Sequence, residues 1–267
     1  VYIKSVNNDL WVEGGITTVK STDAYNSIVF KEDGNGELLV KGSTTVVEPI
    51  AVPQGATLRL DHANALNNLD INREVAGTLA VDKADLELTG DLTLNGTLIV
   101  NAAFTVSNDV TLPGWPGLIT HDAGVEGAAL TVGNVLSIGL NTAINLTGKG
   151  LAGTQSIDGL TGQVEGYGVT SKRGGSHGGL GGGNSPDTND THPDVYGDPR
   201  SPTRLGGGAV HNGWSVGELA AGHGGGAMHV VADTLILEGQ IIADGDDGRN
   251  YDNYTDGGGG AGGSLWL

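Results

Sequence analysis

The chain has 267 residues, of which 48 are Gly, none is Cys and only 4% are Phe, Trp or Tyr, and its formal net charge is −18 at pH 7. The absence of Cys excludes disulfides and thiolate metal sites, and the acidic charge disfavours nucleic acids and anionic membranes as partners. Many Val, Leu, Ile and Thr among small residues suit a thin core of short, closely stacked strands, and no apolar run is long enough for direct membrane insertion.

Residues 1–54 contain strand patterns joined by long connections. Leu10–Val12, Ile28–Phe30 and Leu38–Val40 each place apolar side chains two residues apart, as half-buried strands do. We expect these strands to form either the first coils of a β-fold or a cap over its open end. Because the chain begins at Val1 and ends on the strand-like SLWL, we also expect it to be a piece of a longer protein.

Residues 55–147 repeat short strand patterns with a loose period. In each pattern apolar residues stand at i and i+2, so one face of the strand points inward. Three sets recur at a shared spacing of roughly 17 to 22 residues, which is typical of a solenoid with three faces per turn. The sets are Leu58/Leu60, Leu79/Val81 and Leu98/Val100; Leu69/Ile71, Leu86/Leu88 and Phe104/Val106; and Leu92/Leu94 and Val110/Leu112. The regular spacing predicts a right-handed parallel β-helix and favours it over an antiparallel sandwich, because hairpins need no such regularity.

Residues 148–267 combine strand patterns with clusters of glycine. The clusters stand at 174–183, 206–208, 222–226 and 257–263, and VGELAA at 216–221 has the pattern of a single helical turn. The spacing of Met228/Val230, Leu235/Leu237 and Ile241 suits three successive strands of one coil. We expect the glycine clusters to occupy one corner of successive coils, where side chains would collide. A flexible linker is the alternative, but linkers lack Leu, Val, Ile and His at fixed strand positions.

Four groups of motifs follow one another in this glycine-rich part. They are GKG at 148–150, GGSHGGLGG at 174–182, YGDPRSPTRLGGG at 196–208, and GGGAMHVVADTLILEGQIIADG followed by GGGGAGGSLWL. Together they resemble a recurring glycine-rich region of very large extracellular and cell-surface proteins of bacteria and some protists. The resemblance covers about 144–267 and implies a parallel β-helix module within an adhesin-like protein. It implies no catalytic residue, and GGGAV at 206–210 departs from the pattern, in which a serine stands among the glycines.

Aromatic and basic side chains stand in the loops between the glycine clusters. The aromatic rings could stack on sugars, so we predict a carbohydrate-contacting set. The predicted ligand-binding residues are Tyr196, Arg200, Arg204, Trp214, Tyr251 and Tyr254. The two arginines also adjoin Asp194 and Asp198, and β-helix enzymes such as those similar to pectate lyase use carboxylates with a basic residue. No catalytic signature accompanies them, and pairing with local carboxylates or loop carbonyls is the alternative.

An acidic loop at 244–256 could bind Ca²⁺, a hard cation that takes six to eight oxygen ligands. The predicted metal ligands are Asp244, Asp246, Asp247, Asp252 and Asp256, with a second set at Asp187, Asp190, Asp194 and Asp198. The spacing is not that of an EF-hand, and a solvated acidic loop is the alternative. For His177 we expect the imidazole to pack on glycine backbone and donate to a loop carbonyl, with Zn²⁺ ligation as the alternative.

These features lead us to expect a non-enzymatic, extracellular or cell-surface module of a large bacterial protein, acting as a spacer or adhesion segment. Its partners would be a polysaccharide, a cell-surface glycan or other domains of the same protein. Apart from Ca²⁺, we expect no cofactor. The alternatives are a polysaccharide lyase or glycoside hydrolase of β-helix type, and a spacer stiffened by Ca²⁺.

Overall fold

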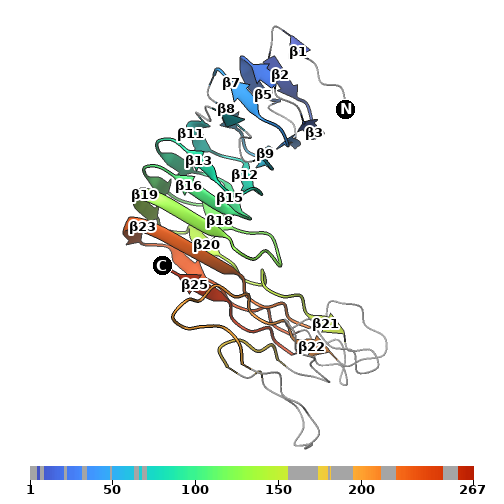
Figure 1. Ribbon diagram of the computed structural model, residues 1–267, viewed down its shortest axis with the longest axis vertical. Coiled ribbons are helices and arrows are strands. Elements are labelled where there is room, and N and C mark those ends of the chain that lie inside the picture. Colours follow the sequence, from blue (N-terminus) through green and yellow to red (C-terminus); the bar gives the residue numbers. More distant parts are fainter. Residues whose placement is uncertain are drawn as a thin grey trace, which may run out of the picture. The chain divides into compact units, whose positions relative to one another are not determined.

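The computed structural model describes most of the chain as strands and extended segments (Figure 1). The described residues are 5–6, 9–20, 23–31, 35–48, 50–62, 66–67, 71–155, 174–179, 181, 195–211, 221–248 and 258–267. Within these ranges the fold is all-β without a helix, and so nothing there could cross a membrane as an apolar helix. The predicted helical turn at 216–221 lies almost wholly outside the described residues.

The chain divides into two compact units, and the division does not follow the sequence in order. The strand unit comprises Val1–Thr120, Ala128–Ile144 and Val230–Ile241. The glycine unit comprises His121–Gly127, Asn145–His229 and Ile242–Leu267. The boundaries expected from the sequence, after residues 54 and 147, stay predictions.

The strands are short, and in the described part of the chain only β19 and β23 exceed five residues. In chain order they are β1 (Ser5–Val6), β2 (Asp9–Val12), β3 (Gly15–Val19), β4 (Asp23–Tyr25), β5 (Ser27–Phe30), β6 (Gly36–Val40), β7 (Thr44–Val46), β8 (Ile50–Val52), β9 (Thr57–Leu60), β10 (Leu66–Asn67), β11 (Ile71–Val75), β12 (Thr78–Val81), β13 (Leu86–Leu88), β14 (Leu92–Leu94), β15 (Thr97–Val100), β16 (Ala103–Val106), β17 (Val110–Leu112), β18 (Leu118–Thr120), β19 (Ala129–Ile138), β20 (Ala143–Asn145), β21 (Thr154–Gln155), β22 (Val210–His211), β23 (Ala227–Leu237), β24 (Gln240–Ile242) and β25 (Ser264–Trp266). Short strands at this density follow from the frequent Gly, Asn and Asp between apolar pairs.

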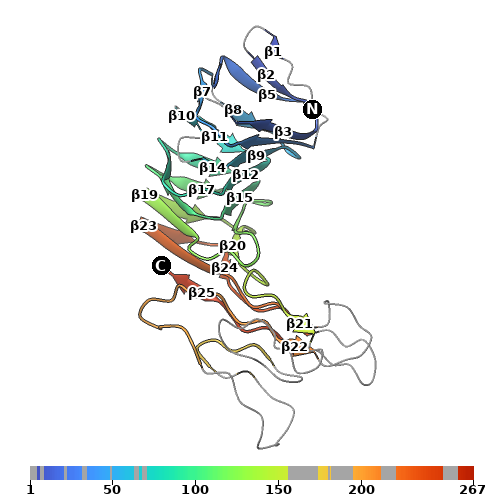
Figure 2. The ribbon, with the colours of Figure 1, turned by 45° about the vertical axis from the view of Figure 1, so that its right-hand side comes forward.

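The longest stack of the strand unit contains eight strands taken in chain order. Its order is β3, β6, β9, β12, β15, β18, β20 and β24, and the pairings from β3 to β20 are parallel. Leu79 lies opposite both Leu58 and Leu98, so the register expected for this set is confirmed. Figure 2 shows β9, β12 and β15 side by side in this stack.

Two further stacks run beside the first and merge at β19. In one stack β13 pairs with β16, and in the other β8, β11, β14 and β17 follow one another. The ten residues of β19 pair with β16 through the first half and with β17 through the second half. Leu86 lies opposite Phe104 and Leu92 opposite Val110, as their spacing predicts.

One strand belongs to a different stack from the one expected. The sequence pattern groups Ile71 with Leu86 and Phe104, whereas Ile71 lies opposite Ile50 in the β8–β17 stack. Apolar residues two apart mark an inward-facing strand, but they do not mark which of two neighbouring stacks it joins. Leu69, the other member of that pair, lies outside the described residues.

The core of the strand unit consists of rows of aliphatic side chains. Leu58, Leu79 and Leu98 are each 0% exposed, and in β9 and β15 these buried residues alternate with partly exposed ones, whereas in β12 the intervening Ala80 is also buried. Burial of one such side chain stabilises the fold by about 1.5–3 kcal/mol. Because each strand of the stack adds its own aliphatic side chains to these rows, the core requires few aromatic residues.

Neighbouring glycine segments of the second unit are joined by backbone hydrogen bonds that recur every three residues. Gly222 donates its N–H to the carbonyl of Gly258 at 3.0 Å, and three residues later Gly225 donates to Ala261 at 2.8 Å. In a β-ladder the donors to one neighbour recur every second residue. A repeat of three is the period of the extended polyproline II type of helix, which has no internal hydrogen bonds.

A second pair of segments runs antiparallel, and its backbone hydrogen bonds also recur every three residues. The N–H of Ala209 donates to Gly222 at 2.9 Å, and the N–H of Gly206 donates to Gly225 at 2.8 Å. A threefold helix turns its peptide groups in three directions, so it can bond to neighbours on several sides. We therefore describe the glycine unit as a bundle of extended threefold segments.

Segment 221–226 illustrates the bundle because it bonds to four other segments. It contacts 146–151, 205–209, 244–246 and 258–264 through backbone hydrogen bonds, whereas a β-strand has at most two neighbours. A Cβ at Gly224 would lie 1.9 Å from the carbonyl oxygen of Gly206, so the close packing requires glycine there. The described glycines therefore belong to closely packed neighbouring segments and not to a flexible linker. They form a bundle and not the corner of stacked β coils that the sequence suggested.

Candidate functional site

All of the predicted site residues that the structure describes belong to the glycine unit. They are Tyr196, Asp198, Arg200, Arg204, Asp244, Asp246 and Asp247. Trp214, Tyr251, Tyr254, Asp252 and Asp256 lie outside the described residues, as do Asp187, Asp190 and Asp194.

His177 joins two distant glycine segments through its ring. Its Nδ1 atom lies 2.9 Å from the carbonyl oxygen of Gly262, which can only accept, so Nδ1 carries the proton. The other ring nitrogen lies against Gly197, where a Cβ would approach to 2.9 Å. The expectation that His177 packs on glycine backbone and donates to a loop carbonyl is confirmed. Loop 195–201 is thereby tied to segment 258–263.

Tyr196 packs against His177 and is held in place by a hydrogen bond of its own. Its hydroxyl donates to the carbonyl oxygen of Leu205 at 2.7 Å, and its ring lies against His177 with centroids 5.0 Å apart. The side chain is half-buried. A sugar-stacking platform needs an open ring face, so Tyr196 serves the local fold more directly than the predicted ligand contact.

Ser264 and His177 resemble a nucleophile and a base only in their proximity. The Ser264 Oγ lies 3.3 Å from His177 Nε2, but its proton is donated to the carbonyl of Arg204 at 2.7 Å. Ser264 is also only 3% exposed. A nucleophilic serine must give its proton to the base and face the substrate. This geometry therefore anchors β25 to residues 204–205 and provides no hydrolytic dyad.

Arg200 and Asp198 form a local turn. The Arg200 N–H donates to the Asp198 Oδ1 at 2.9 Å, and the Ser201 N–H donates to the Asp198 carbonyl at 3.1 Å. An Asp-Pro start followed by this i to i+3 bond is a common β-turn arrangement. The guanidinium group of Arg200 is exposed, so it stays available to solvent.

Arg204 reaches a carboxylate from another part of the glycine unit. Its Nη1 lies 3.9 Å from the Oε1 of Glu126, with the two side chains 47% and 52% exposed. An exposed pair at this distance contributes little to stability. Sequence patterns gave no reason to connect residue 126 with residue 204.

The three described aspartates of the acidic loop do not converge on one point. The carbonyl of Asp244 accepts from the Gly148 N–H at 3.0 Å, and Asp246 bonds through its backbone to His223 and Gly260. The carboxylate of Asp246 lies against Gly148, whereas Asp244 and Asp247 are exposed. Across the described ranges no group of three His, Asp or Glu could hold a metal ion.

Comparison with known proteins gives no match that assigns the chain to a family. No family model matches it, and neither the curated proteins nor the solved structures give a significant match. The function must therefore be argued from the residues themselves.

His121 is a buried histidine that sequence patterns did not single out. It is 0% exposed, its Nδ1 lies 2.7 Å from the carbonyl of Asp122, and its Nε2 accepts from the Ala227 N–H at 3.1 Å. Accepting at Nε2 requires the neutral ring with the proton on Nδ1. Burial lowers the pKa of His121, and the positive charge of Lys149 lowers it further, against the opposing effects of Asp122.

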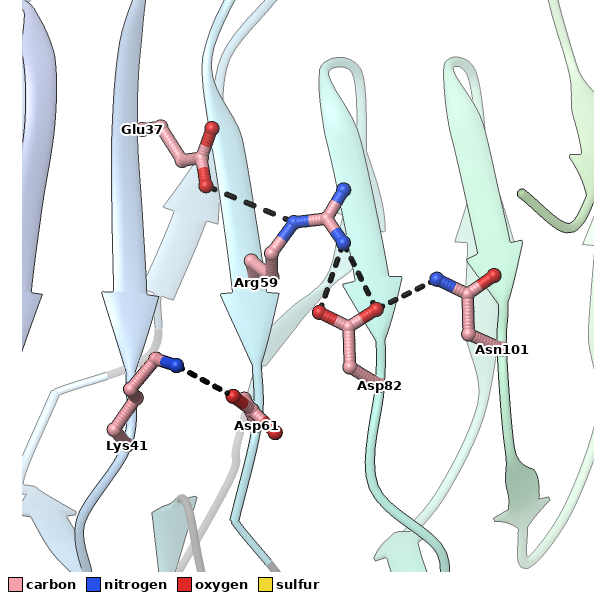
Figure 3. Close-up of polar contacts among 6 residues, drawn as sticks. All are labelled: Glu37, Lys41, Arg59, Asp61, Asp82 and Asn101. Carbon is pink, nitrogen blue, oxygen red and sulfur yellow. Dashed lines mark hydrogen bonds and ion pairs between the residues drawn. The ribbon is translucent and has the colours of Figure 1, made fainter. Parts of the chain in front are cut away.

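The strand unit carries a polar row on the outside of its longest stack (Figure 3). The Nη1 of Arg59 lies 2.8 Å from the carboxylate of Asp82, and its Nε lies 3.6 Å from Glu37. Asn101 donates to the same Asp82 at 2.6 Å. These contacts join β6 and β9 to the residues that directly follow β12 and β15, so they brace neighbouring strands of the stack.

The most exposed aromatic side chain of the described residues was also missed. Trp115 is 81% exposed, and it stands in the loop between β17 and β18. Gly117 donates to Gly114 at 3.0 Å across the base of this loop, and Pro113 and Pro116 flank the tryptophan. An isolated Trp in a loop has no sequence periodicity, so only its exposure identifies it.

Proposed function

We propose that the chain is a non-catalytic structural module that acts as a rigid spacer or adhesion segment. The observation that carries this proposal is the uninterrupted parallel stack from β3 to β20, whose inward rows stay buried from coil to coil. Its fold is a right-handed parallel β-helix joined to a threefold glycine bundle. Such a core resists deformation along its length because every coil bonds to the next.

The place of action is the surface or exterior of a bacterial cell, as part of a larger protein. The resemblance of the glycine motifs supports this location. The net charge of −18 agrees with a protein surrounded by screening cations. Expression of the full-length gene product and surface labelling of intact cells would test it, and labelling only after lysis would contradict it.

Contact with a glycan is the form of adhesion that we favour, and Trp115 is the side chain that supports it. An indole ring that is 81% exposed offers both faces to the C–H groups of a sugar. A neutral polysaccharide suits the acidic chain better than an anionic one. The test is calorimetric titration with neutral and acidic oligosaccharides. Trp115→Ala should abolish binding, whereas the control Val47→Ala, at a site 75% exposed, should retain it.

A polysaccharide lyase or glycoside hydrolase is the alternative from another class. Incubation with a panel of glycans would release new reducing ends or unsaturated products if the chain were such an enzyme. The spacer proposal predicts neither product. Cleavage that disappears in Asp198→Ala or Arg200→Ala would replace the proposal with the enzyme alternative.

A spacer stiffened by Ca²⁺ is a second alternative and has its own test. Binding to the native state alone would raise the melting temperature in proportion to the logarithm of the ion concentration. The described carboxylates Asp244, Asp246 and Asp247 point to no shared site, so we expect the same melting temperature with Ca²⁺ and with a chelator. A rise with Ca²⁺ that disappears in Asp246→Asn would support the alternative.

A further inference from the structure

The second half of β23 continues the buried rows of the stack that ends in β17 and β19, but its own apolar side chains are exposed. The N–H groups of Glu238 and Gly239 both donate to the carbonyl of Ile138 at 2.9 Å. Earlier in the same stack, the N–H groups of Ala76 and Gly77 both donate to the carbonyl of Val52, which lies opposite Val75. By this correspondence Leu237 lies opposite Ile138, and Leu235 lies opposite Leu136.

Exposure changes abruptly along these rows. Leu136 and Ile138 are 0% exposed, whereas Leu235 is 39% and Leu237 is 49% exposed. The preceding members Val110 and Leu112 are also 0% exposed. The rows thus end at Leu235 and Leu237, which are placed like core residues but are not covered by a further strand of the described chain.

The backbone of the same strand is free along one edge. β23 pairs with β19 on one side, and on the other side β25 pairs with Ala227–His229 only. Among the described residues no strand pairs with the outer edge of 231–237. An unpaired edge next to uncovered apolar rows is a template for another strand.

We propose that residues 231–237 bind an extended strand of a partner polypeptide, running parallel to β23. The partner carries apolar residues two apart, opposite Leu235 and Leu237. The parallel direction follows from β25, which lies parallel on the preceding residues of this edge. Only an extended peptide supplies both backbone partners and apolar side chains at alternate positions. Because Asp233 and Glu238 are exposed at either end, basic residues flank the apolar ones in the partner.

The test uses a synthetic peptide with the sequence of β19, ALTVGNVLSI, extended by one Lys at each end. This sequence is a suitable probe because it already pairs with β23 in the native fold. Hydrogen exchange of the intact chain is followed by mass spectrometry while the peptide is titrated. We expect exchange of residues 231–237 to slow by about tenfold or more at saturation. A scrambled peptide should have no effect.

Three variants separate strand addition from unspecific adsorption. Asp233→Pro removes an edge N–H and places a ring there, so it should abolish the protection. Leu235→Thr with Leu237→Thr should weaken it at least about tenfold by removing apolar contacts. Ile236→Thr is the matched control and should keep most of it, because residue 236 points to the opposite face. Circular dichroism and melting curves establish that each variant folds.

Three results would overturn the proposal. The first is unchanged exchange at residues 231–237 at millimolar peptide. The second is protection that persists in Asp233→Pro, or in the double threonine variant if the proline variant does not fold. The third is protection that grows with protein concentration in the absence of peptide, since a second copy of the chain would then occupy the edge.

Discussion

The Nδ1 atom of His177 lies 2.9 Å from the carbonyl oxygen of Gly262, 85 residues further along the chain. This bond joins a loop residue to a glycine segment that has no side chain to hold it. The ring of Tyr196 lies against the same imidazole and extends the contact to Leu205. His177 therefore has a structural role, because it holds two segments that are distant in the sequence together.

Replacing His177 by Ala should destabilise the glycine unit by about 1–2 kcal/mol, because the hydrogen bond and the contact with Tyr196 are both lost. Urea unfolding followed by tyrosine fluorescence would measure the change. His223→Ala is a matched control in a similar glycine setting, and it should cost less than about 0.5 kcal/mol. Equal effects of the two substitutions would contradict the assigned role of His177.

A pair of glycine substitutions tests the packing of the bundle. Gly224→Ala should destabilise the glycine unit by about 3 kcal/mol or more, since the new Cβ would meet a backbone oxygen that cannot move aside. Gly262→Ala should be nearly neutral, because the nearest atom to its Cβ lies 3.7 Å away. Melting curves of the two variants provide the comparison. A tolerated Gly224→Ala would show that the segments are not closely packed.

The stability of the glycine unit should fall in mild acid because of His121. Burial holds the pKa of the folded ring below its ordinary value of 6.5, so the unfolded chain binds the proton more readily. The contribution is complete above pH 6.5 and is lost as the pH falls through the folded pKa. Protonation would also remove the acceptor for Ala227 and place a charge near Lys149.

The measurement is the free energy of unfolding between about pH 5 and pH 7.5 for the wild type and for His121→Gln. The wild type should have the steeper dependence on pH. Identical slopes would mean that His121 titrates normally in the folded state and that the groups facing it, Asp122 and Lys149, compensate for burial.

The polar row in Figure 3 offers two ion pairs that differ in exposure. The side chains of Arg59 and Asp82 are 25% and 17% exposed, whereas those of Lys41 and Asp61 are 44% and 34% exposed. Arg59→Ala should cost about 1 kcal/mol after allowance for solvent screening, and Lys41→Ala less than about 0.5 kcal/mol. The effect of Arg59→Ala should shrink in high salt, and a salt-independent loss would point to packing of its methylene groups instead.

The strand registers could be predicted because the positions of the apolar side chains in the sequence reflect them. Leu58, Leu79 and Leu98 face the same interior, so selection for burial leaves apolar residues at matching positions of successive coils. Ile71 was misplaced because two neighbouring stacks bury the same kind of residue. Apolar spacing alone does not encode which of the two stacks a strand joins.

The glycine bundle could be predicted only in part. The composition indicated ordered, closely packed segments, but glycine has no side chain whose periodicity would reveal a repeat of three or the identity of the neighbours. The role of His177 followed from its glycine surroundings, whereas its partner Gly262 did not. The hydroxyl bond from Tyr196 to the carbonyl of Leu205, nine residues away, could not be predicted because such a contact leaves no pattern in the sequence.

Amide hydrogen exchange resolved to single residues would show whether the glycine segments form an ordered threefold bundle. In such a bundle the amides of Gly222, Gly224 and Gly225, which donate to three different residues, exchange at least about a hundredfold more slowly than in an unstructured chain. Exchange of these three amides at the rate of an unstructured chain would contradict this arrangement.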